Sequence, residues 1–234
     1  MVRTIVYTAH PDIATSSSQQ FLVSSGKHIT DVEYVDLQSE WNIHKKFNKE
    51  REIERLKQFD RIFFQFNFYW YQAPAILKLW MDSVFEDKQT NPQFFNEFRG
   101  RELGIVVIAG VKEEHFQAGG REKRTLSELL SPYESFANYY QLKYLPIFSV
   151  HQFANKSELE KMKLMYEYSC YLEEGTHLSY LTFQGYLLRK LDELDLEEHL
   201  DLSAEQELIF NLWQNDLEDQ ADEVSELFEL TDGW

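Results

Sequence analysis

Short apolar runs alternate with amphipathic stretches along the first 175 residues of the chain. Each run is of strand length and rich in β-branched or aromatic residues, as in strands buried on both faces of a sheet. Between the runs, apolar residues recur at helical spacing, and hydroxyl residues or prolines mark where the helices begin. The apolar runs are residues 3–8, 31–37, 60–66, 102–110 and 142–150, and the helical stretches are 16–26, 48–58, 73–86, 125–140 and 157–175.

This alternation predicts an α/β domain with a parallel sheet, right-handed crossovers and helices on both faces. Pro146 indicates that the last strand is an edge strand or ends irregularly, and Pro132 predicts a break in the helix at 125–140. Ligands of such sheets bind beyond the carboxyl ends of the strands. The loops at 9–18, 67–73 and 109–124 are therefore the candidate functional loops.

The pattern changes after residue 190. Residues 202–214, with a capping box formed by Ser203 and Gln206, and residues 221–230 carry large apolar residues at helical spacing, which predicts one or two amphipathic helices. From Leu191 to Trp234 there are 16 Asp and Glu residues and no Lys or Arg, so this segment carries almost all of the net charge of −17. We expect a domain at 1–190 and an acidic helical extension at 191–234.

Composition excludes several classes of protein. The nearly neutral first 190 residues offer no basic patch for nucleic acid. A single cysteine, Cys170, excludes an intrachain disulfide and suits a reducing compartment, so we expect a cytoplasmic protein. We expect no signal peptide, no transmembrane segment and, because the seven histidines are scattered, no metal site.

The first candidate loop reads "HPDIATSSSQQ". Hydroxyl groups and backbone N–H groups converge at a helix N-terminus directly after a buried strand, and the helix dipole favours negative charge there. A phosphate group is the natural ligand of such a loop. The alternative is that Ser16 only caps the helix.

The other two loops offer rings and charges. Phe68 to Tyr71 are aromatic without interruption, which suits stacking on a planar heterocycle or, alternatively, packing in a core or dimer contact. The loop "AGVKEEHFQAGGREKR" contains His115, which either serves catalysis or belongs to an ordinary solvated loop.

The segments "AHP", "YWYQAPAILKLWMD" and "TLSELLSPYESFANYYQLKYLPIFSVH" together resemble the NAD(P)H:quinone oxidoreductases with a flavodoxin-like fold. The resemblance covers roughly residues 3–175 and is greatest to the smaller bacterial branch, which includes drug-activity modulators and ancillary oxidoreductase subunits of glutathione-gated potassium efflux systems. It implies a five-stranded parallel sheet of order 2-1-3-4-5. It also implies a homodimer that holds a non-covalent flavin, FMN or alternatively FAD, at its interface.

The resemblance also assigns residues to the site by position. His10, Ser16, Ser17, Ser18 and Gln19 would hold the flavin phosphate, Phe68, Tyr69, Trp70 and Tyr71 would border the isoalloxazine, and Ile108, Ala109, Gly110 and Val111 would line its other side. Tyr71 and His115 are the catalytic candidates. The implied reaction is ping-pong: NAD(P)H reduces the flavin, and a quinone or similar diffusible acceptor then takes a hydride in the same pocket.

Two departures from the family pattern leave other functions open. "IAGV" replaces the usual T-T-G-G, and Phe116 with Arg121 or Glu122 replaces a Tyr and a His that assist hydride transfer in mammalian members. The alternatives are a flavin-binding regulatory or partner subunit with little turnover, acting with a peripheral partner protein, and a protein that has lost its cofactor.

Overall fold

The computed structural model describes residues 2–176, 179–192 and 203–231, and it divides into two compact units, Met1–Thr176 and His177–Trp234. We call the first unit the body and the second the tail. The charge-based boundary after residue 190 lies inside a tail helix, α8 (Tyr180–Asp192). Whether it separates independently folding domains stays a prediction.

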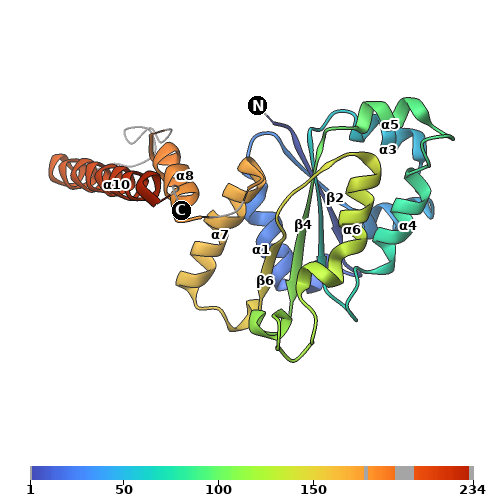
Figure 1. The fold of residues 1–234 in the computed structure, drawn as a ribbon, viewed down its shortest axis with the longest axis horizontal. Coiled ribbons are helices and arrows are strands. Elements are labelled where there is room, and N and C mark those ends of the chain that lie inside the picture. The colour runs from blue at the N-terminus through green and yellow to red at the C-terminus, as the bar shows by residue number, and fades with distance from the viewer. Residues whose placement is uncertain (1, 177–178, 193–202, 232–234) are drawn as a thin grey trace. The chain divides into compact units, whose positions relative to one another are not determined.

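The body is built on a parallel sheet of order β2-β1-β3-β4-β5, in which the strands run toward one end of the unit (Figure 1). This confirms the predicted flavodoxin-like order. The strands are β1 (Thr4–Ala9), β2 (Val32–Asp36), β3 (Arg61–Asn67), β4 (Glu102–Ala109), β5 (Lys143–Tyr144) and β6 (Phe148–His151).

The fifth position of the sheet is divided between two short strands. β5 pairs with the start of β4 and β6 pairs with its end, so both extend the same edge. Pro146 lies between them and has no N–H to continue the ladder. The prediction that Pro146 marks an irregular edge strand is confirmed.

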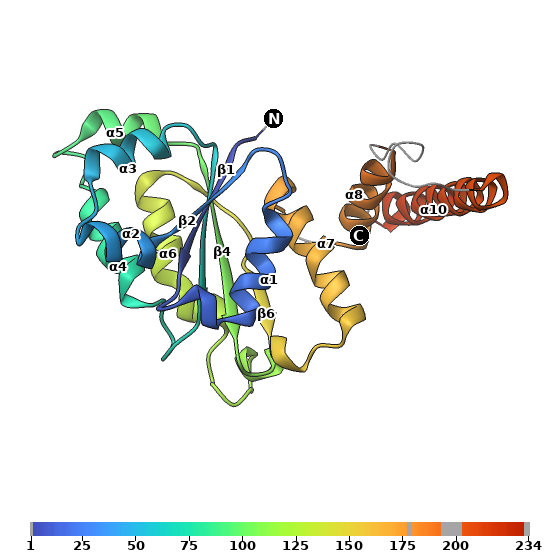
Figure 2. The same cartoon turned by 180° about the vertical axis from the view of Figure 1, so that it is seen from behind.

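Helices cover both faces of the sheet (Figures 1 and 2). α1 (Ser17–Gly26) and α7 (Glu158–Glu174) pack together on one face. The other face carries α2 (Leu37–His44), α3 (Lys49–Leu56), α4 (Ala75–Val84), α5 (Pro92–Phe98) and α6 (Leu126–Tyr140). α2 and α5 were not predicted, because each has only seven or eight residues and shows too little apolar periodicity.

The predicted break at Pro132 is wrong, because α6 runs continuously through that residue. A proline at this position leaves the carbonyl of Glu128, four residues earlier, without its helical N–H partner. The hydroxyl of Ser131 donates to that carbonyl at 2.8 Å. The neighbouring side chain thus replaces the missing donor and the helix continues.

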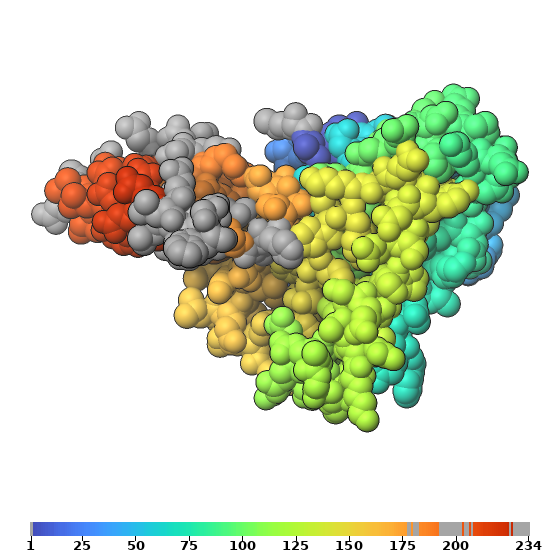
Figure 3. Space-filling view, in the orientation of Figure 1, coloured from blue at the N-terminus to red at the C-terminus, as the bar shows by residue number. Residues whose placement is uncertain are grey.

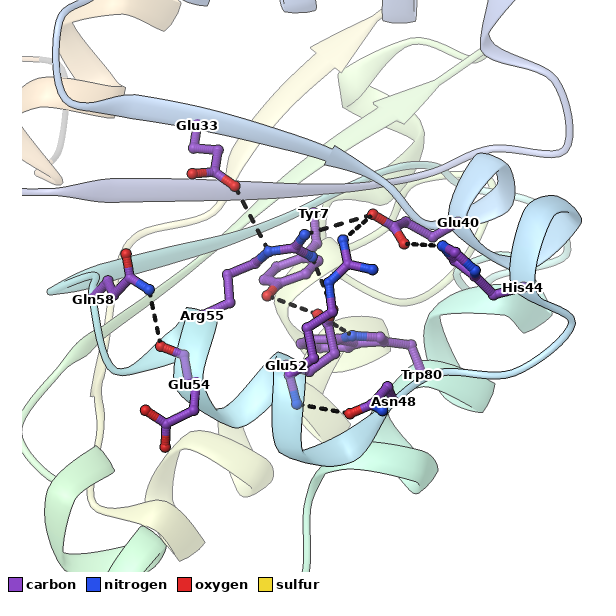
Figure 4. Close-up of polar contacts among 11 residues, drawn as sticks. Tyr7, Glu33, Glu40, His44, Asn48, Glu52, Glu54, Arg55, Gln58 and Trp80 are labelled. Atoms are coloured by element: carbon purple, nitrogen blue, oxygen red, sulfur yellow. Dashed lines mark hydrogen bonds and ion pairs between the residues drawn. The ribbon is translucent and has the colours of Figure 1, made fainter.

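A buried carboxylate, Glu52 on α3, lies between the sheet and α4 (Figure 4). It accepts hydrogen bonds from the Tyr7 hydroxyl at 3.2 Å, from the Trp80 indole at 3.0 Å and from Arg55 at 2.8 Å. Burial and the nearby carboxylate raise the pKa of Tyr7. Burial alone would lower the pKa of Arg55, but Glu52 and its neighbours raise it overall, so both partners stay protonated.

The tail contains α8 and α10 (Ala204–Thr231), which pack against each other, and Gln184 donates to the Leu217 carbonyl at 3.0 Å. The two predicted amphipathic segments belong to one helix, because no Gly or Pro interrupts residues 204–231. Ser203 and Gln206 form the predicted capping box. None of the described helices is both long enough and apolar enough to cross a membrane.

Candidate functional site

The loops after β1, β3 and β4 emerge at the same end of the body, beyond the carboxyl ends of the strands (Figure 1). The loop after β4 protrudes there, as the green surface in Figure 3 shows. A backbone contact joins the loop after β3 to the end of β4, since Phe68 N–H donates to the Ile108 carbonyl at 2.8 Å, and the side chains of His10 and Tyr69 link the loops after β1 and β3. The structure therefore brings the three predicted loops together at one edge of the sheet.

The first loop leads through a short 3-10 turn, η1 (Ile13–Thr15), into α1. Ser16 caps the helix, with its hydroxyl accepting from Gln19 N–H at 3.4 Å and lying 3.3 Å from the Ser18 hydroxyl. Ser16 and Ser18 are buried, whereas Ser17 is exposed. The first N–H groups of a helix have no intrahelical acceptor, so this end of α1 can still donate to an anion.

His10, at the end of β1, fixes the orientation of Tyr69. Asp12 N–H donates to Nδ1 of His10 at 3.1 Å, so the proton of the neutral imidazole resides on Nε2. Nε2 lies 2.9 Å from the Tyr69 hydroxyl, and therefore donates to it. The hydroxyl hydrogen of Tyr69 remains available to a ligand. The structure thus pairs two predicted site residues from different loops.

Gln19 lies at the same helix end but its side chain is completely buried. Its amide nitrogen donates to Asn67 Oδ1 at 2.9 Å, and its amide oxygen accepts from Gln65 at 2.7 Å. The Gln19 side chain is thus used inside the protein. The Gln19 backbone takes no part in these side-chain contacts, but its N–H already donates to the Ser16 hydroxyl.

The aromatic segment after β3 forms a two-residue turn. Tyr69 and Gln72 exchange backbone hydrogen bonds of 3.1 and 3.0 Å, with Trp70 and Tyr71 at the tip. Both tip residues have positive φ, +50° and +63°, the geometry of a type I′ turn that ordinarily uses Asn or Gly. Trp70 is 92% exposed. The backbone is held in an uncommon conformation that presents a large flat ring to solvent.

Tyr71 contacts the third loop. Its hydroxyl donates to Glu122 at 2.6 Å, and Arg121 pairs with the same carboxylate. These hydrogen bonds, that from Tyr71 first, lower the pKa of Glu122, and the carboxylate raises the pKa of Tyr71. The Glu122 N–H donates to the His115 carbonyl at 3.0 Å, and Nδ1 of His115 is buried without a partner among the described residues. Both catalytic candidates thus contact Glu122, which the sequence had singled out only as one of two residues that could replace a family histidine.

The segment Ile108–Val111 presents N–H groups to the site. The carbonyls of Ile108, Ala109 and Val111 accept from Phe68 N–H, Gln152 N–H and the His151 ring respectively. The N–H groups of Gly110 and Val111 have no acceptor in the part of the chain that the structure describes. Free space surrounds Gly110, where an added Cβ would meet nothing within 4 Å. This segment can donate hydrogen bonds to ligand carbonyl or ring-nitrogen acceptors.

His151, at the end of β6, is a site-lining residue that sequence reasoning missed. Its Nδ1 lies 3.0 Å from the Val111 carbonyl and must donate to it, while its buried Nε2 has no partner among the described residues. Burial lowers the pKa of His151, so the ring is neutral at neutral pH. The signal was available, because "FSVH" places a polar residue at a strand end beside the loop at 109–124.

The residues present fit a flavin. Aromatic rings and N–H donors suit the flat, acceptor-rich isoalloxazine, and the α1 N-terminus with its hydroxyls suits a phosphate. No group of three or more His, Cys, Asp or Glu among the described residues could hold a metal ion. A depression of about 260 Å³ between α2 and α3 lies apart from this edge, and none of the candidate residues lines it.

Comparisons with known proteins agree with this geometry. Residues 3–169 match the family described as having a flavodoxin-like fold. The chain is similar to a protein of Bacillus subtilis named as the uncharacterized NAD(P)H oxidoreductase YrkL, 33% identical over 63% of this chain and 84% of YrkL. It is also similar to the potassium-efflux ancillary protein KefF of an Enterobacter species, 30% identical over 63% and 81%.

Two solved structures are similar over most of the body. An NADPH-quinone reductase from P. pentosaceus is 38% identical with a TM-score of 0.65, covering 73% of this chain and 97% of that one. General stress protein 14 from Treponema denticola, solved with FMN, shares the fold at 24% identity and a TM-score of 0.66, covering 74% and 99%. The chain belongs to the flavodoxin-like fold family, as its sequence segments predicted.

Proposed function

We propose that this protein is an FMN-dependent NAD(P)H oxidoreductase that reduces a quinone or a similar diffusible acceptor by a ping-pong mechanism. The observation that carries the proposal is the convergence of three loops at one sheet edge, offering aromatic rings, unpaired N–H groups and a capped helix N-terminus. The similarity to YrkL and to the P. pentosaceus quinone reductase supports it. FAD is the alternative cofactor.

Each loop has a part in holding the flavin. The α1 N-terminus with Ser16, Ser17 and Ser18 would bind the phosphate, and His10 would orient the Tyr69 hydroxyl toward the ligand. Phe68, Trp70 and Tyr71 would border one side of the ring. The N–H groups of Gly110 and Val111 would donate to the acceptors along its edge. Ile108 and Ala109 would line that edge through the strand end.

Bound FMN would supply the chemistry, accepting a hydride from NAD(P)H and passing it to the acceptor. The protein orients the ring and keeps its polar edge hydrogen-bonded. Tyr71 and His115 are the candidate groups for holding or moving a proton near the acceptor, because Tyr71 donates to the Glu122 carboxylate and the Glu122 N–H donates to the His115 carbonyl. We further propose that the protein acts in the cytoplasm as a homodimer, which would cover the exposed Trp70.

A second candidate function is a flavin-binding regulatory or partner subunit with little turnover. Phe116 is buried against Phe68 and the His151 ring, and it has no hydroxyl to assist proton transfer. The similarity to KefF, named as an ancillary protein of a potassium-efflux system, is consistent with a peripheral partner protein.

The test is an absorbance spectrum of the purified protein, followed by NADPH or NADH without oxygen. We expect flavin bands that bleach, and that recover when a quinone is added. Bands that persist would support the regulatory subunit. No flavin after reconstitution with FMN and with FAD would refute both functions.

A further inference from the structure

A buried chain of hydrogen bonds runs between the sheet and the helices α1 and α7, and it ends at the candidate site. Its members are Tyr34 on β2, Tyr168 on α7, Gln65 on β3, Gln19 on α1 and Asn67 at the end of β3. The successive separations are 2.9, 2.5, 2.7 and 2.9 Å. Four secondary-structure elements contribute to it, so it is fixed by the fold.

All the hydrogen bonds in this series donate in the same direction. The Tyr168 hydroxyl has one hydrogen and donates it to the Gln65 carbonyl, so the Tyr34 hydroxyl must donate to Tyr168. Gln65 then donates to the Gln19 carbonyl through its amide nitrogen, and Gln19 donates to the Asn67 carbonyl. Burial raises the pKa of Tyr168 and of Tyr34, so both hydroxyls keep their hydrogens. Every step therefore donates toward the site.

The direction decides which end of the Asn67 amide is free. Its oxygen is taken by Gln19, and its nitrogen has no acceptor among the described residues. Gln19 and Gln65 are completely buried, while Asn67 is half-buried at the carboxyl edge. The free NH₂ group thus lies at the carboxyl end of β3, and the amide that carries it is linked through Gln19 to the first turn of α1.

We propose that Asn67 is a flavin-binding residue whose NH₂ group donates to the FMN phosphate, and that Gln19, Gln65 and Tyr168 are positioning residues that fix this orientation. The inference rests on the proposed function. It gives Gln19, predicted among the phosphate-binding residues, an indirect role for its side chain, because both ends of the Gln19 amide are already hydrogen-bonded. Gln19 acts on the ligand through Asn67.

The first experiment compares FMN with riboflavin, which lacks the phosphate, by titration of wild-type protein and Asn67→Asp. Aspartate has the same shape and keeps the oxygen that accepts from Gln19, but it replaces the outward NH₂ with a negatively charged oxygen. We expect FMN to bind Asn67→Asp about 100-fold more weakly, from loss of a charge-assisted bond and repulsion, with riboflavin affected less than about threefold. Asn67→Ser, which is smaller, should weaken FMN about tenfold.

The second experiment tests positioning by a double-mutant cycle. Tyr168→Phe removes the hydroxyl that donates to the Gln65 carbonyl, so the amide groups of Gln65, Gln19 and Asn67 are no longer held in one orientation. We expect FMN affinity to fall about fivefold. The same change in the Asn67→Ser background should have no further effect. Tyr171→Phe is the matched control. Tyr171 is also buried on α7, but its hydroxyl donates to the Pro146 carbonyl and takes no part in the series of hydrogen bonds from Tyr34 to Asn67. It should bind FMN as wild type does.

The outcomes separate this inference from the proposed function. Wild-type protein that binds neither FMN nor FAD overturns both. Wild-type binding that Asn67→Asp leaves unchanged, or equal losses for FMN and riboflavin, overturns the Asn67 contact and leaves the oxidoreductase proposal standing. An effect of Tyr168→Phe that persists in the Asn67→Ser background overturns the positioning role.

Discussion

Trp70 combines an unfavourable backbone conformation with almost complete exposure of its ring. Positive φ at a residue with a Cβ costs about 1–2 kcal/mol, and an exposed ring regains little of this by packing. A strained, exposed aromatic residue at the candidate site is better explained by ligand binding than by stability.

Two substitutions at this position should separate strain from binding. Both Trp70→Ala and Trp70→Gly remove the ring, but only glycine adopts positive φ without strain. We expect the glycine variant to be about 1 kcal/mol more stable than the alanine variant in urea unfolding. Both should bind FMN about tenfold more weakly than wild type. Equal stability of the two variants would show that the turn relaxes in solution.

Glu52 permits a residue-scale test of stability away from the site. It is buried and accepts from three donors, so Glu52→Ala leaves Tyr7, Trp80 and Arg55 without their shared acceptor. We expect the free energy of unfolding to fall by about 3–5 kcal/mol, as when one partner of a buried ion pair is removed. Glu54→Ala, on the exposed side of the same helix, should change it by less than about 0.5 kcal/mol. A loss below about 1 kcal/mol for Glu52→Ala would contradict the role assigned to the cluster.

At the scale of elements, the end of β6 is tied to the loop after β4 by His151 and the Val111 carbonyl. Burial lowers the pKa of His151, opposed by the Val111 carbonyl and Glu113 and assisted by Lys156. As the pH falls below the ordinary histidine pKa of about 6.5, His151 therefore binds a proton in the unfolded chain at a higher pH than in the native protein. This contribution to stability is complete above about pH 6.5 and is lost as the pH falls through the lowered native pKa.

His151→Asn should isolate this effect, because an asparagine amide can still donate to the Val111 carbonyl but does not titrate. We expect the unfolding free energy of wild type to decrease between pH 7 and 5 by more than that of His151→Asn, measured by urea unfolding at several pH values. His28→Asn removes an exposed histidine and serves as the control. Identical pH dependences for wild type and His151→Asn would exclude burial of a neutral imidazole.

The sequence predicted elements well where periodicity was long or strands were continuous. It found every position of the sheet and the three loops, because buried parallel strands read as uninterrupted apolar runs. It missed α2, α5 and α8, and the break at Pro132 was wrong because a hydroxyl one residue earlier replaced the lost donor. Local propensity cannot show such a compensation.

The sequence predicted which loops at the strand ends form the candidate site, but it did not predict the contacts between their side chains. His10 and the aromatic turn lie at loops that the pattern located, and the structure adds that His10 orients Tyr69. Gln65 and Asn67 were overlooked because a polar residue in an apolar strand gives no sign of a distant partner. Tyr168 lies 103 residues from Gln65, and Gln19 lies 48 residues from Asn67. Long-range hydrogen bonds between side chains depend on packing that one sequence does not reveal.

At the scale of the whole molecule, the family match and the change in charge give different ends for the body, residue 169 and residue 190. The family match ends at residue 169, and the P. pentosaceus structure is 97% covered by 73% of this chain. That structure therefore forms the fold with almost no counterpart of the remaining 27% of this chain. The described acidic residues of the tail lie on α8 and α10, and such residues favour solvation of a helix surface.

Two truncations test whether the body folds alone and where its boundary lies. We expect a chain ending at Thr176 to unfold cooperatively, with the midpoint and FMN affinity of the full-length protein, because the body holds its own core and α7 ends at Gly175 with a left-handed cap. A chain ending at Lys190 should behave identically if the boundary follows the compact units. If the shorter chain is less stable than the longer one, residues 177–190 belong to the folding unit and the boundary suggested by charge is the correct one. Loss of FMN binding or of the dimer from both chains would instead show that the tail completes the site or the interface.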